Sequence, residues 1–209
     1  MKKKQIEDAI YDGLVKILLP FGFKGKKRDY AFRRETSSGF QDCTFSLADY
    51  NPVFAFSVNV GLRFDAIEDI TNQFPPAPQE AAKNSLSVVL GLPYFTGRDG
   101  RYEVQSFEEI DDALAELQTA FTTAIFPFLE HCTSLEAGER LLNDSVGKPF
   151  ITRPDRVALS GVTAAALCRR SDFSDIVSRY RDAMSQYVPP IRQRFETLVT
   201  HLTTHVRSV

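Results

Sequence analysis

The segment from residue 52 to residue 64 alternates apolar with small or polar side chains, and this pattern constrains the fold more than any other in the chain. Successive side chains of a strand point to opposite faces, so the apolar set would share one face. This set is Phe54, Phe56, Val58, Val60, Leu62 and Phe64. The opposite face would carry Ala55, Ser57, Asn59, Gly61 and Arg63. Such a strand is typical of an antiparallel sheet covered on one face, and its polar face is where a ligand could bind.

The composition is that of an ordinary globular protein. With 209 residues, 43% of them hydrophobic and 25% charged, the sequence suits one domain or one domain with an appendage. No apolar run approaches the roughly 18 residues that span a bilayer, so no membrane association is predicted. Lysines at residues 2–4 resemble the start of a signal peptide, but Glu7, Asp8 and Asp12 interrupt the apolar stretch that would have to follow. We therefore expect a cytoplasmic protein.

The charges are unevenly distributed along the chain. Residues 1–34 hold ten Lys or Arg against four acids, residues 35–149 hold six against eighteen, and residues 150–209 hold nine against five. The net charge of −2 leaves no overall basic excess for duplex binding, which argues against nucleic acid as a partner. The acidic middle is either a set of solvated faces or a surface that attracts a basic protein partner.

The residue types that bind metals or form catalytic motifs do not occur in the required patterns. Cys43, Cys132 and Cys168 are odd in number and widely spaced, which argues against a disulfide framework or a cysteine zinc site. His201 and His205 lie four apart on a predicted helix, but zinc needs three or four ligands and no glutamate follows His201. Dinucleotide, phosphate-loop and nucleophile-elbow motifs are absent from the sequence. We predict no metal, no cofactor and no catalytic residue.

The first half of the chain predicts one helix followed by strands. Apolar residues three or four apart predict a helix over 4–19, and strands are expected at 29–34, 40–48 and 52–64 with short turns between them. Residues 65–74 are compatible with a short helix. The stretch 85–92 is compatible with a strand or with the end of a helix that begins near Gln79, and Arg101–Val104 is compatible with the closing strand of a hairpin.

The second half predicts helices. Ser106 and Glu109 have the spacing of a capping box, and an apolar stripe from Phe107 to Phe128 follows, with Pro127 stopping or kinking this helix. Further helices are expected over about 134–143, capped by Thr133, then from 154 to 170, from 172 to 187 and from 191 onward.

These elements define an α+β fold. We predict an antiparallel meander sheet of four or five strands with helices packed on one face, plus a C-terminal helical hairpin. The composition changes near residues 143–149, so we divide the chain into an α+β domain (1–148) and a C-terminal helical extension (149–209) that packs on it.

The most specific candidate site is the polar face of the predicted sheet. If the strands pair in sequence order, six side chains stand together there: Arg33, Thr44, Ser46, Ser57, Asn59 and Arg63. Two guanidinium groups beside hydroxyls and an amide could hold a carboxylate, a phosphate or a backbone segment of a partner. The alternative is an ordinary solvated sheet face, or one that the C-terminal helices cover.

Three short motifs resemble a known family. Gly22-Phe23-Lys24-x-Lys26, Tyr30-x-Phe32-Arg33-Arg34 and Phe56-x-Val58-Asn59-Val60-Gly61, together with Pro127-Phe128-Leu129, are similar to the bacterial domain-of-unknown-function family 4304. The resemblance covers about residues 5–145. Cys43-Thr-Phe-Ser-Leu47 replaces the glutamine-rich second strand of that family. The resemblance implies a bacterial cytosolic α+β protein and offers no catalytic residues to transfer.

We therefore expect a soluble bacterial protein that binds or regulates another protein without catalysis, in the manner of an immunity protein. The alternative is an enzyme that acts on a small anionic substrate bound on the polar sheet face by Arg33, Asn59 and Arg63.

Overall fold

The computed structural model describes residues 2–74, 82–144 and 153–206, and these residues form two compact units. The first unit contains the described residues of 1–36, 40–61 and 90–131, and the second contains those of 37–39, 62–89 and 132–209. The predicted domain boundary between residues 148 and 149 lies outside the described residues, so it stays a prediction. The compact units differ from that division because residues 62–89 and 132–144 group with the C-terminal helices.

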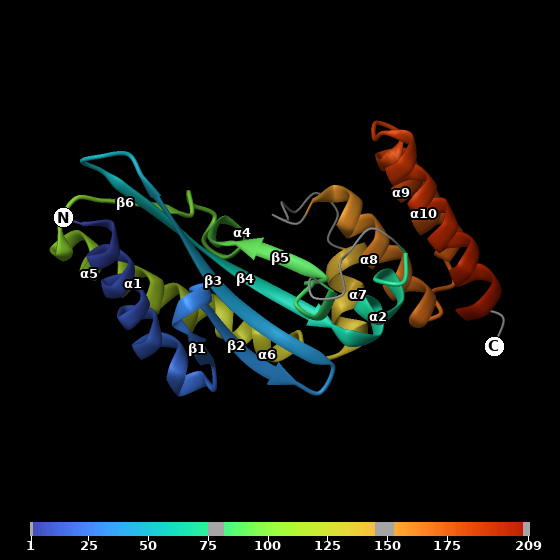
Figure 1. The fold of residues 1–209 in the computed structure, drawn as a ribbon. Helices are drawn as coiled ribbons and strands as arrows, with labels where there is room; N and C mark the ends of the chain where they lie inside the picture. Colours follow the sequence, from blue (N-terminus) through green and yellow to red (C-terminus); the bar gives the residue numbers. More distant parts are fainter. Residues whose placement is uncertain (1, 75–81, 145–152, 207–209) are drawn as a thin grey trace. The chain divides into compact units, whose positions relative to one another are not determined.

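Six described strands form one open sheet (Figure 1). They are β1 (Lys24–Lys26), β2 (Ala31–Thr36), β3 (Gly39–Asp49), β4 (Phe54–Phe64), β5 (Val88–Gly91) and β6 (Arg101–Val104). Their order is β1-β2-β3-β4-β5, and β6 also pairs with β4. The β2-β3-β4 meander and the α+β class are confirmed. The stretch 85–92, which the sequence left open, contains a strand.

The pairing of β6 corrects the predicted hairpin. Arg101–Val104 pairs antiparallel with the start of β4, with Phe54 opposite Val104 and Ser57 opposite Arg101. The residues before β6 include a short helix, α4 (Leu92–Thr96), which the sequence analysis did not predict. Pro93 lies in the first turn of α4, where its missing N–H has no helical partner to lose.

The alternation along β4 produces the predicted apolar face. Phe54, Phe56, Val58 and Val60 are each at most 5% exposed. On the opposite face only Ser57 and Asn59 are partly open, and Ala55, Gly61 and Arg63 are buried. Strand β1 was missed because Lys24-Gly25-Lys26 has no apolar residue to alternate. It pairs antiparallel with β2, and Gly25 lies opposite Phe32. A Cβ at Gly25 would stand 2.3 Å from the hydroxyl of Tyr11, a residue of the N-terminal helix. The close approach of that helix to β1 therefore requires glycine at this position.

The helices of the first unit are mostly those that periodicity predicts (Figure 1). They are α1 (Lys3–Leu18), η1 (Leu19–Phe21), η2 (Lys27–Asp29), α4, α5 (Phe107–Ala120), the π-helical segment η3 (Phe121–Ile125) and α6 (Phe126–His131). Helix α1 packs along α5 through its predicted apolar stripe, which is buried. Ser106 caps α5 by accepting a hydrogen bond from the Glu109 N–H at 3.1 Å.

Pro127 does not end the helical region. The chain passes through the wider π turn of η3, and α6 then continues to His131. A proline ring clashes with the carbonyl four residues earlier in a regular α-helix, and a π turn changes that spacing. Pro127 predicts an irregularity in the helix, and the irregular segment, η3, lies just before this proline.

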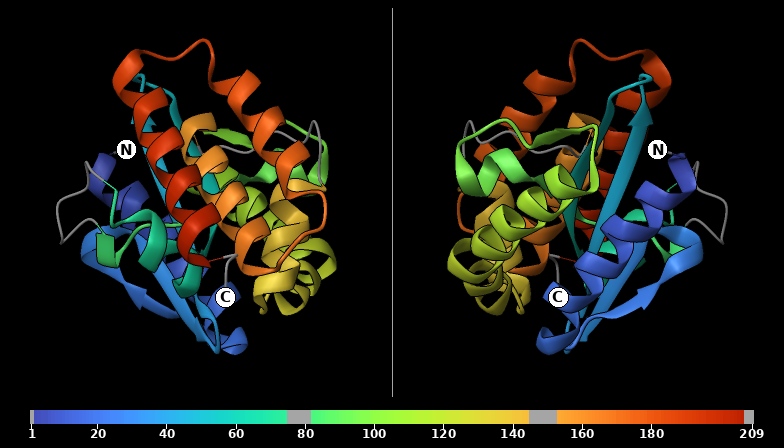
Figure 2. Two further views of the ribbon diagram at one scale, coloured as in Figure 1. Left: turned by 90° about the vertical axis from the view of Figure 1, so that its right-hand side faces the viewer. Right: turned by 90° about the vertical axis from the view of Figure 1, so that its left-hand side faces the viewer.

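Helices dominate the second unit (Figure 2). They are α2 (Asp65–Thr71), α7 (Leu135–Asn143), α8 (Pro154–Leu167), α9 (Phe173–Met184), α10 (Pro189–His201) and the π-helical segment η4 (Leu202–Val206). The cap of α7 is Ser134, which accepts from the Ala137 N–H, and not the predicted Thr133. The predicted C-terminal helices are all present.

Helix α8 is the centre of this unit. Eleven of its fourteen residues are buried, since α2, α7, α9 and α10 all pack against it. Ala164, Ala165 and Ala166 are completely buried, so the small residues of this segment serve close packing. Gly161 lies so close to Tyr180 of α9 that a Cβ there would be 2.3 Å from the tyrosine hydroxyl. The hydrophobic core of the second unit is built around α8.

Candidate functional site

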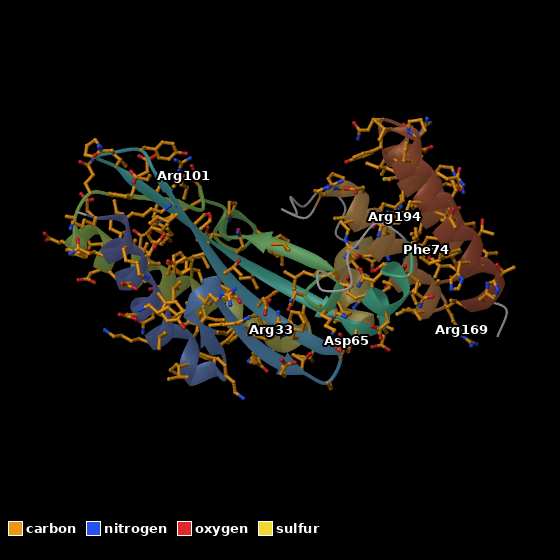
Figure 3. The ribbon with its side chains drawn as sticks, viewed as in Figure 1. Arg33, Asp65, Phe74, Arg101, Arg169 and Arg194 are labelled. Atoms are coloured by element: carbon orange, nitrogen blue, oxygen red, sulfur yellow. The ribbon has the colours of Figure 1, made fainter. Side chains whose placement is uncertain are left out.

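Arg33 of the predicted polar face is bound to a neighbouring strand (Figure 3). Its Nε and Nη2 donate to the two carboxylate oxygens of Asp42 at 2.7 and 2.8 Å, and its guanidinium lies 3.4 Å from the centre of the Phe40 ring. The charge-assisted bonds to Asp42 raise the pKa of Arg33. The Arg33 guanidinium therefore already binds a carboxylate of the protein through two hydrogen bonds, in the geometry that was expected to bind a ligand.

The other predicted site residues of the first unit have fewer interactions with the rest of the protein. The hydroxyls of Ser46 and Ser57 lie 3.0 Å apart across the β3–β4 pair, so the structure brings these two together as predicted. Thr44 and Asn59 are partly buried, and Ser46 is exposed. These four residues offer hydroxyls and an amide, but no charge to attract an anion.

Arg63 belongs to the second unit, where it is 8% exposed. Its Nε donates to Asp65 at 2.5 Å, and its Nη1 donates to the carbonyl of Ala82 at 2.8 Å and to the hydroxyl of Ser85 at 3.0 Å. This guanidinium therefore anchors residues 82–85 beside β4. The predicted grouping of Arg33 with Arg63 around one anion stays a prediction, and both side chains already have protein partners.

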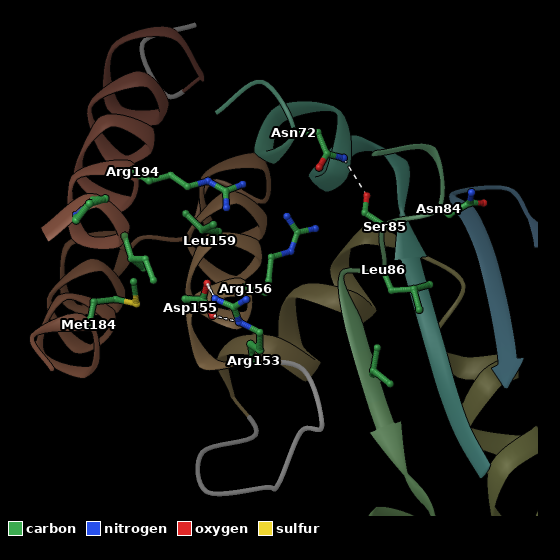
Figure 4. Close-up of a pocket in the computed structure, with 13 residues that line it drawn as sticks. Asn72, Asn84, Ser85, Leu86, Arg153, Asp155, Arg156, Leu159, Met184 and Arg194 are labelled. Atoms are coloured by element: carbon green, nitrogen blue, oxygen red, sulfur yellow. Dashed lines mark hydrogen bonds and ion pairs between the residues drawn. The ribbon is translucent and has the colours of Figure 1, made fainter. Parts of the chain in front are cut away.

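A different site lies wholly within the second unit: a pocket of about 780 Å³ at the N-terminal ends of α8 and α10 (Figure 4). Its volume falls in the range of small-molecule sites, roughly 300–1,000 Å³. The apolar part of the lining comes from Leu86, Val89, Leu159, Met184, Pro190 and Ile191. The polar part comes from Asn72, Asn84, Ser85, Arg153, Asp155, Arg156 and Arg194. An apolar wall with a few charged groups suits a ligand with a charged head and an apolar body.

Two of the three arginines in this pocket are paired with carboxylates. Arg153 donates from Nε and Nη2 to Asp155 at 3.0 and 2.9 Å. Arg156 donates from Nη2 to Glu68 at 2.7 Å, and Glu68 is completely buried. Neither arginine therefore adds an uncompensated charge to the pocket.

Arg194 differs from both. Among the described residues, no carboxylate lies within ion-pair distance of it, and its recorded bond is from Nη2 to the carbonyl of Thr71 at 3.4 Å. Its Nε is shielded from solvent and has no hydrogen-bond partner in the described part of the chain. Desolvation and then the positive charge of Arg156 lower the pKa of Arg194. Figure 4 shows Arg194 reaching from α10 toward the α8 side of the pocket.

The same wall carries an unpartnered acceptor. Asn72 donates from Nδ2 to the hydroxyl of Ser85 at 2.9 Å, while its Oδ1 is buried and has no partner among the described residues. Asn72 follows Thr71, whose carbonyl binds Arg194, so the orphan donor and the orphan acceptor flank one peptide group. Buried polar groups without partners are uncommon in native proteins, and the second unit holds two others among its described residues, Asn143 Oδ1 and Ser160 Oγ.

The described residues show neither a metal site nor a membrane-spanning helix. Within residues 2–74, 82–144 and 153–206, no group of three or more His, Cys, Asp or Glu has the arrangement of a metal site. His201 and His205 stack on each other, and Phe74 packs edge-on against His201. No helix in the described part of the chain is both long and apolar enough to cross a bilayer.

Comparisons of the chain with protein-family models, curated proteins and solved structures found no match. The resemblance to the domain-of-unknown-function family 4304 therefore stays a prediction, as do the bacterial origin and the cytoplasmic location.

Sequence reasoning missed the arginine pocket entirely. Its residues come from four separate stretches: 72, 84–89, 153–159 and 184–194. One signal was present in the sequence, since residues 150–209 hold nine basic residues against five acids. That excess indicates a positive region but not which arginine would lack a partner.

Proposed function

We propose that this protein binds a small amphipathic anion in the pocket lined by Arg194 and does not convert it chemically. The observation that carries the proposal is the half-buried side chain of Arg194, which lines the pocket and has no carboxylate within ion-pair distance among the described residues. A positive charge that is partly removed from water gains from an anionic partner. A ligand carboxylate, phosphate or sulfonate would supply that partner, while Leu159, Met184 and Ile191 would contact its apolar body.

We favour binding over catalysis because the other polar side chains in and near the pocket already bind groups of the protein. Asp155 is bound to Arg153, and the Glu68 carboxylate behind the pocket is bound to Arg156. The Ser85 hydroxyl donates to the Ala82 carbonyl at 2.7 Å and accepts from Asn72. The described residues that line the pocket include no histidine or cysteine to act as a base or nucleophile.

This proposal keeps the non-enzymatic character expected from the sequence and changes the ligand from a protein to a small molecule. The immunity-like protein-binding role stays a prediction, as does the alternative enzyme with its site on the polar sheet face. Arg33 of that face is bound to Asp42, which makes the pocket the stronger candidate for binding an anion.

Two fluorescent probes with nearly the same ring system test the proposal. Anilinonaphthalene sulfonate carries an anionic group, and phenylnaphthylamine is its neutral counterpart. We expect the protein to bind the sulfonate more tightly, and Arg194→Gln to weaken sulfonate binding by about tenfold to a hundredfold, as loss of a charged hydrogen bond does. Binding of the neutral probe should change little.

Arg192→Gln is the matched control, because Arg192 is exposed on the same helix and does not line the pocket. Near-ultraviolet circular dichroism should verify that both variants keep native packing, since the sulfonate also binds loosely packed states. If both variants bind the sulfonate with equal affinity, the proposal is wrong.

A further inference from the structure

We infer that the first unit binds a small zwitterion, such as a free amino acid with an apolar side chain, in a pocket of its own. This pocket has a volume of about 390 Å³, and its lining comes entirely from residues between 92 and 124, which belong to the first unit. The volume falls in the range of small-molecule sites. None of these residues lines the anion site proposed for the second unit.

Part of the lining is apolar and aromatic. Leu92 and Phe95 come from α4, and Tyr102 comes from β6. Leu92 is buried, whereas Tyr102 is partly exposed and its ring stacks on Phe56 with the ring centres 5.2 Å apart. This part of the pocket suits an alkyl or aryl group of a ligand.

Two opposite charges line the same pocket without binding each other. Arg98 lies in the loop between α4 and β6, Glu116 lies on α5, and both residues are exposed to solvent. Within the described part of the chain, neither side chain forms an ion pair or a hydrogen bond. Both charges act on the Tyr102 hydroxyl, because burial and the negative charge of Glu116 raise the pKa of Tyr102 while Arg98 lowers it. A guanidinium and a carboxylate therefore lie within electrostatic range of one phenol, and a ligand can reach both.

A zwitterion would give each of these charges a partner. Its carboxylate can accept two parallel hydrogen bonds from the Arg98 guanidinium, and its ammonium group can donate to Glu116. Thr119 and Thr123 also line the pocket, and their hydroxyls donate to helix carbonyls at 3.1 and 2.8 Å. Their oxygens keep lone pairs that can accept the other N–H groups of the ammonium.

A ligand with a single charge fits this lining less well. An anion would meet Glu116 and Asp99, and a cation would meet Arg98. Residues 98–116 hold seven acids against two arginines, an excess that opposes a ligand of net negative charge. A zwitterion has no net charge and avoids both repulsions when each end faces the opposite charge.

Isothermal titration with phenylalanine and two of its derivatives tests the inference. Phenylalanine amide lacks the carboxylate, and N-acetylphenylalanine lacks the ammonium group. The titrations use Arg194→Gln beside the wild type, because N-acetylphenylalanine is also an anion of the kind proposed for the second unit. We expect both proteins to bind phenylalanine equally, and Arg194→Gln to bind it about tenfold to a hundredfold more tightly than either derivative, as a charged hydrogen bond contributes. Equal affinity for phenylalanine and either derivative, or no binding of phenylalanine, would overturn the inference and leave the proposed function standing.

Variants that remove one charge each locate the bound amino acid. Glu116→Gln and Arg98→Gln should each weaken phenylalanine binding by about tenfold or more, and both replace exposed side chains, so the fold should be kept. Asp112→Asn is the matched control, since Asp112 is exposed on the same helix as Glu116 and lies outside the lining. If phenylalanine binding is lost in Arg194→Gln, or is kept in Glu116→Gln, the amino acid binds elsewhere and the inference is wrong.

Discussion

The buried carboxylate of Glu68 offers the sharpest test of how the second unit is held together. Glu68 is completely buried in α2, and its two oxygens accept hydrogen bonds from Arg156 at 2.7 Å and from the hydroxyl of Ser87 at 3.0 Å. Arg156 starts from α8, so this ion pair joins two helices that pack together. Glu68→Gln keeps the size of the side chain and removes its charge.

The expected loss of stability follows from the burial of both partners. Breaking a buried pair by removing one charge costs about 3–5 kcal/mol, because the remaining charge is left uncompensated. The Arg156 side chain is 19% exposed, so water can partly hydrate it and the loss should lie near the lower end of that range. We expect a decrease of about 3 kcal/mol in the free energy of unfolding, which corresponds to a melting temperature lower by about 6–12 °C for a chain of this size.

Urea unfolding followed by circular dichroism measures this change. Glu130→Gln is the matched control, because Glu130 also pairs with an arginine, Arg34, at 2.5 Å but has a side chain that is 62% exposed. Exposed pairs contribute about 0–1 kcal/mol, so the control should lose no more than that. If Glu68→Gln loses less than about 1 kcal/mol, or as little as the control, burial does not set the strength of the Glu68–Arg156 pair and the reasoning fails.

Two further predictions concern packing and pH within the second unit. Gly138→Ala would normally favour a helix, but the new Cβ would lie 2.5 Å from the Phe64 ring, so we expect the urea midpoint to show a net loss of about 1–3 kcal/mol; a gain would contradict the packing argument. Burial raises the pKa of Tyr180 from 10.0 to about 12. Folding therefore favours the neutral phenol, so the wild type keeps its full stability below pH 10 and loses part of it as the pH rises toward 12. Tyr180→Phe does not titrate, so the stability of the wild type relative to this variant should fall over that interval; a constant difference would refute this.

The sequence predicted those parts of the fold that depend on local periodicity. The alternation of β4 and the stripe of α5 both gave buried faces where expected, because a strand or helix with one apolar face must pack that face inward. Strand β1 and helix α4 were not predicted, because neither shows a local periodic pattern of this kind. Lys24–Lys26 has no buried side chain, and its extended conformation comes from pairing with β2, which a local pattern cannot report.

The candidate site could not be predicted because its character depends on which charges are already paired. Arg33 was expected to face a ligand, but the sequence does not say that this arginine binds Asp42 of the neighbouring strand. In the same way, Arg63 is buried by the segment around Ala82 and Ser85, whose path from β4 the sequence does not define. Site prediction from one sequence finds charged residues but not their partners.

A partial rule nevertheless emerges from the paired arginines. Three of them precede an aspartate by two residues at the start of a helix, and each binds that aspartate: Arg63 with Asp65, Arg153 with Asp155, and Arg170 with Asp172. At these positions the chain is entering a helix, and the aspartate carboxylate also lies near the positive end of the helix dipole. The Arg-x-Asp pattern at a predicted helix start thus indicates an arginine that is already bound.

Arg194 has the same spacing to an acid, Glu196, and yet does not pair with it, for a reason that agrees with its proposed role in binding an anion. Both residues lie inside α10, where side chains two positions apart point about 200° away from each other. Glu196 binds Arg181 of α9 through both carboxylate oxygens, at 2.7 and 2.9 Å. The helix therefore directs the acid toward α9 and the guanidinium toward the pocket. Because Glu196 points toward α9 and is bound there, we expect Glu196→Gln to release Arg181 and to leave binding of anilinonaphthalene sulfonate unchanged in a fluorescence titration; a large change in sulfonate affinity would contradict this account of the pocket.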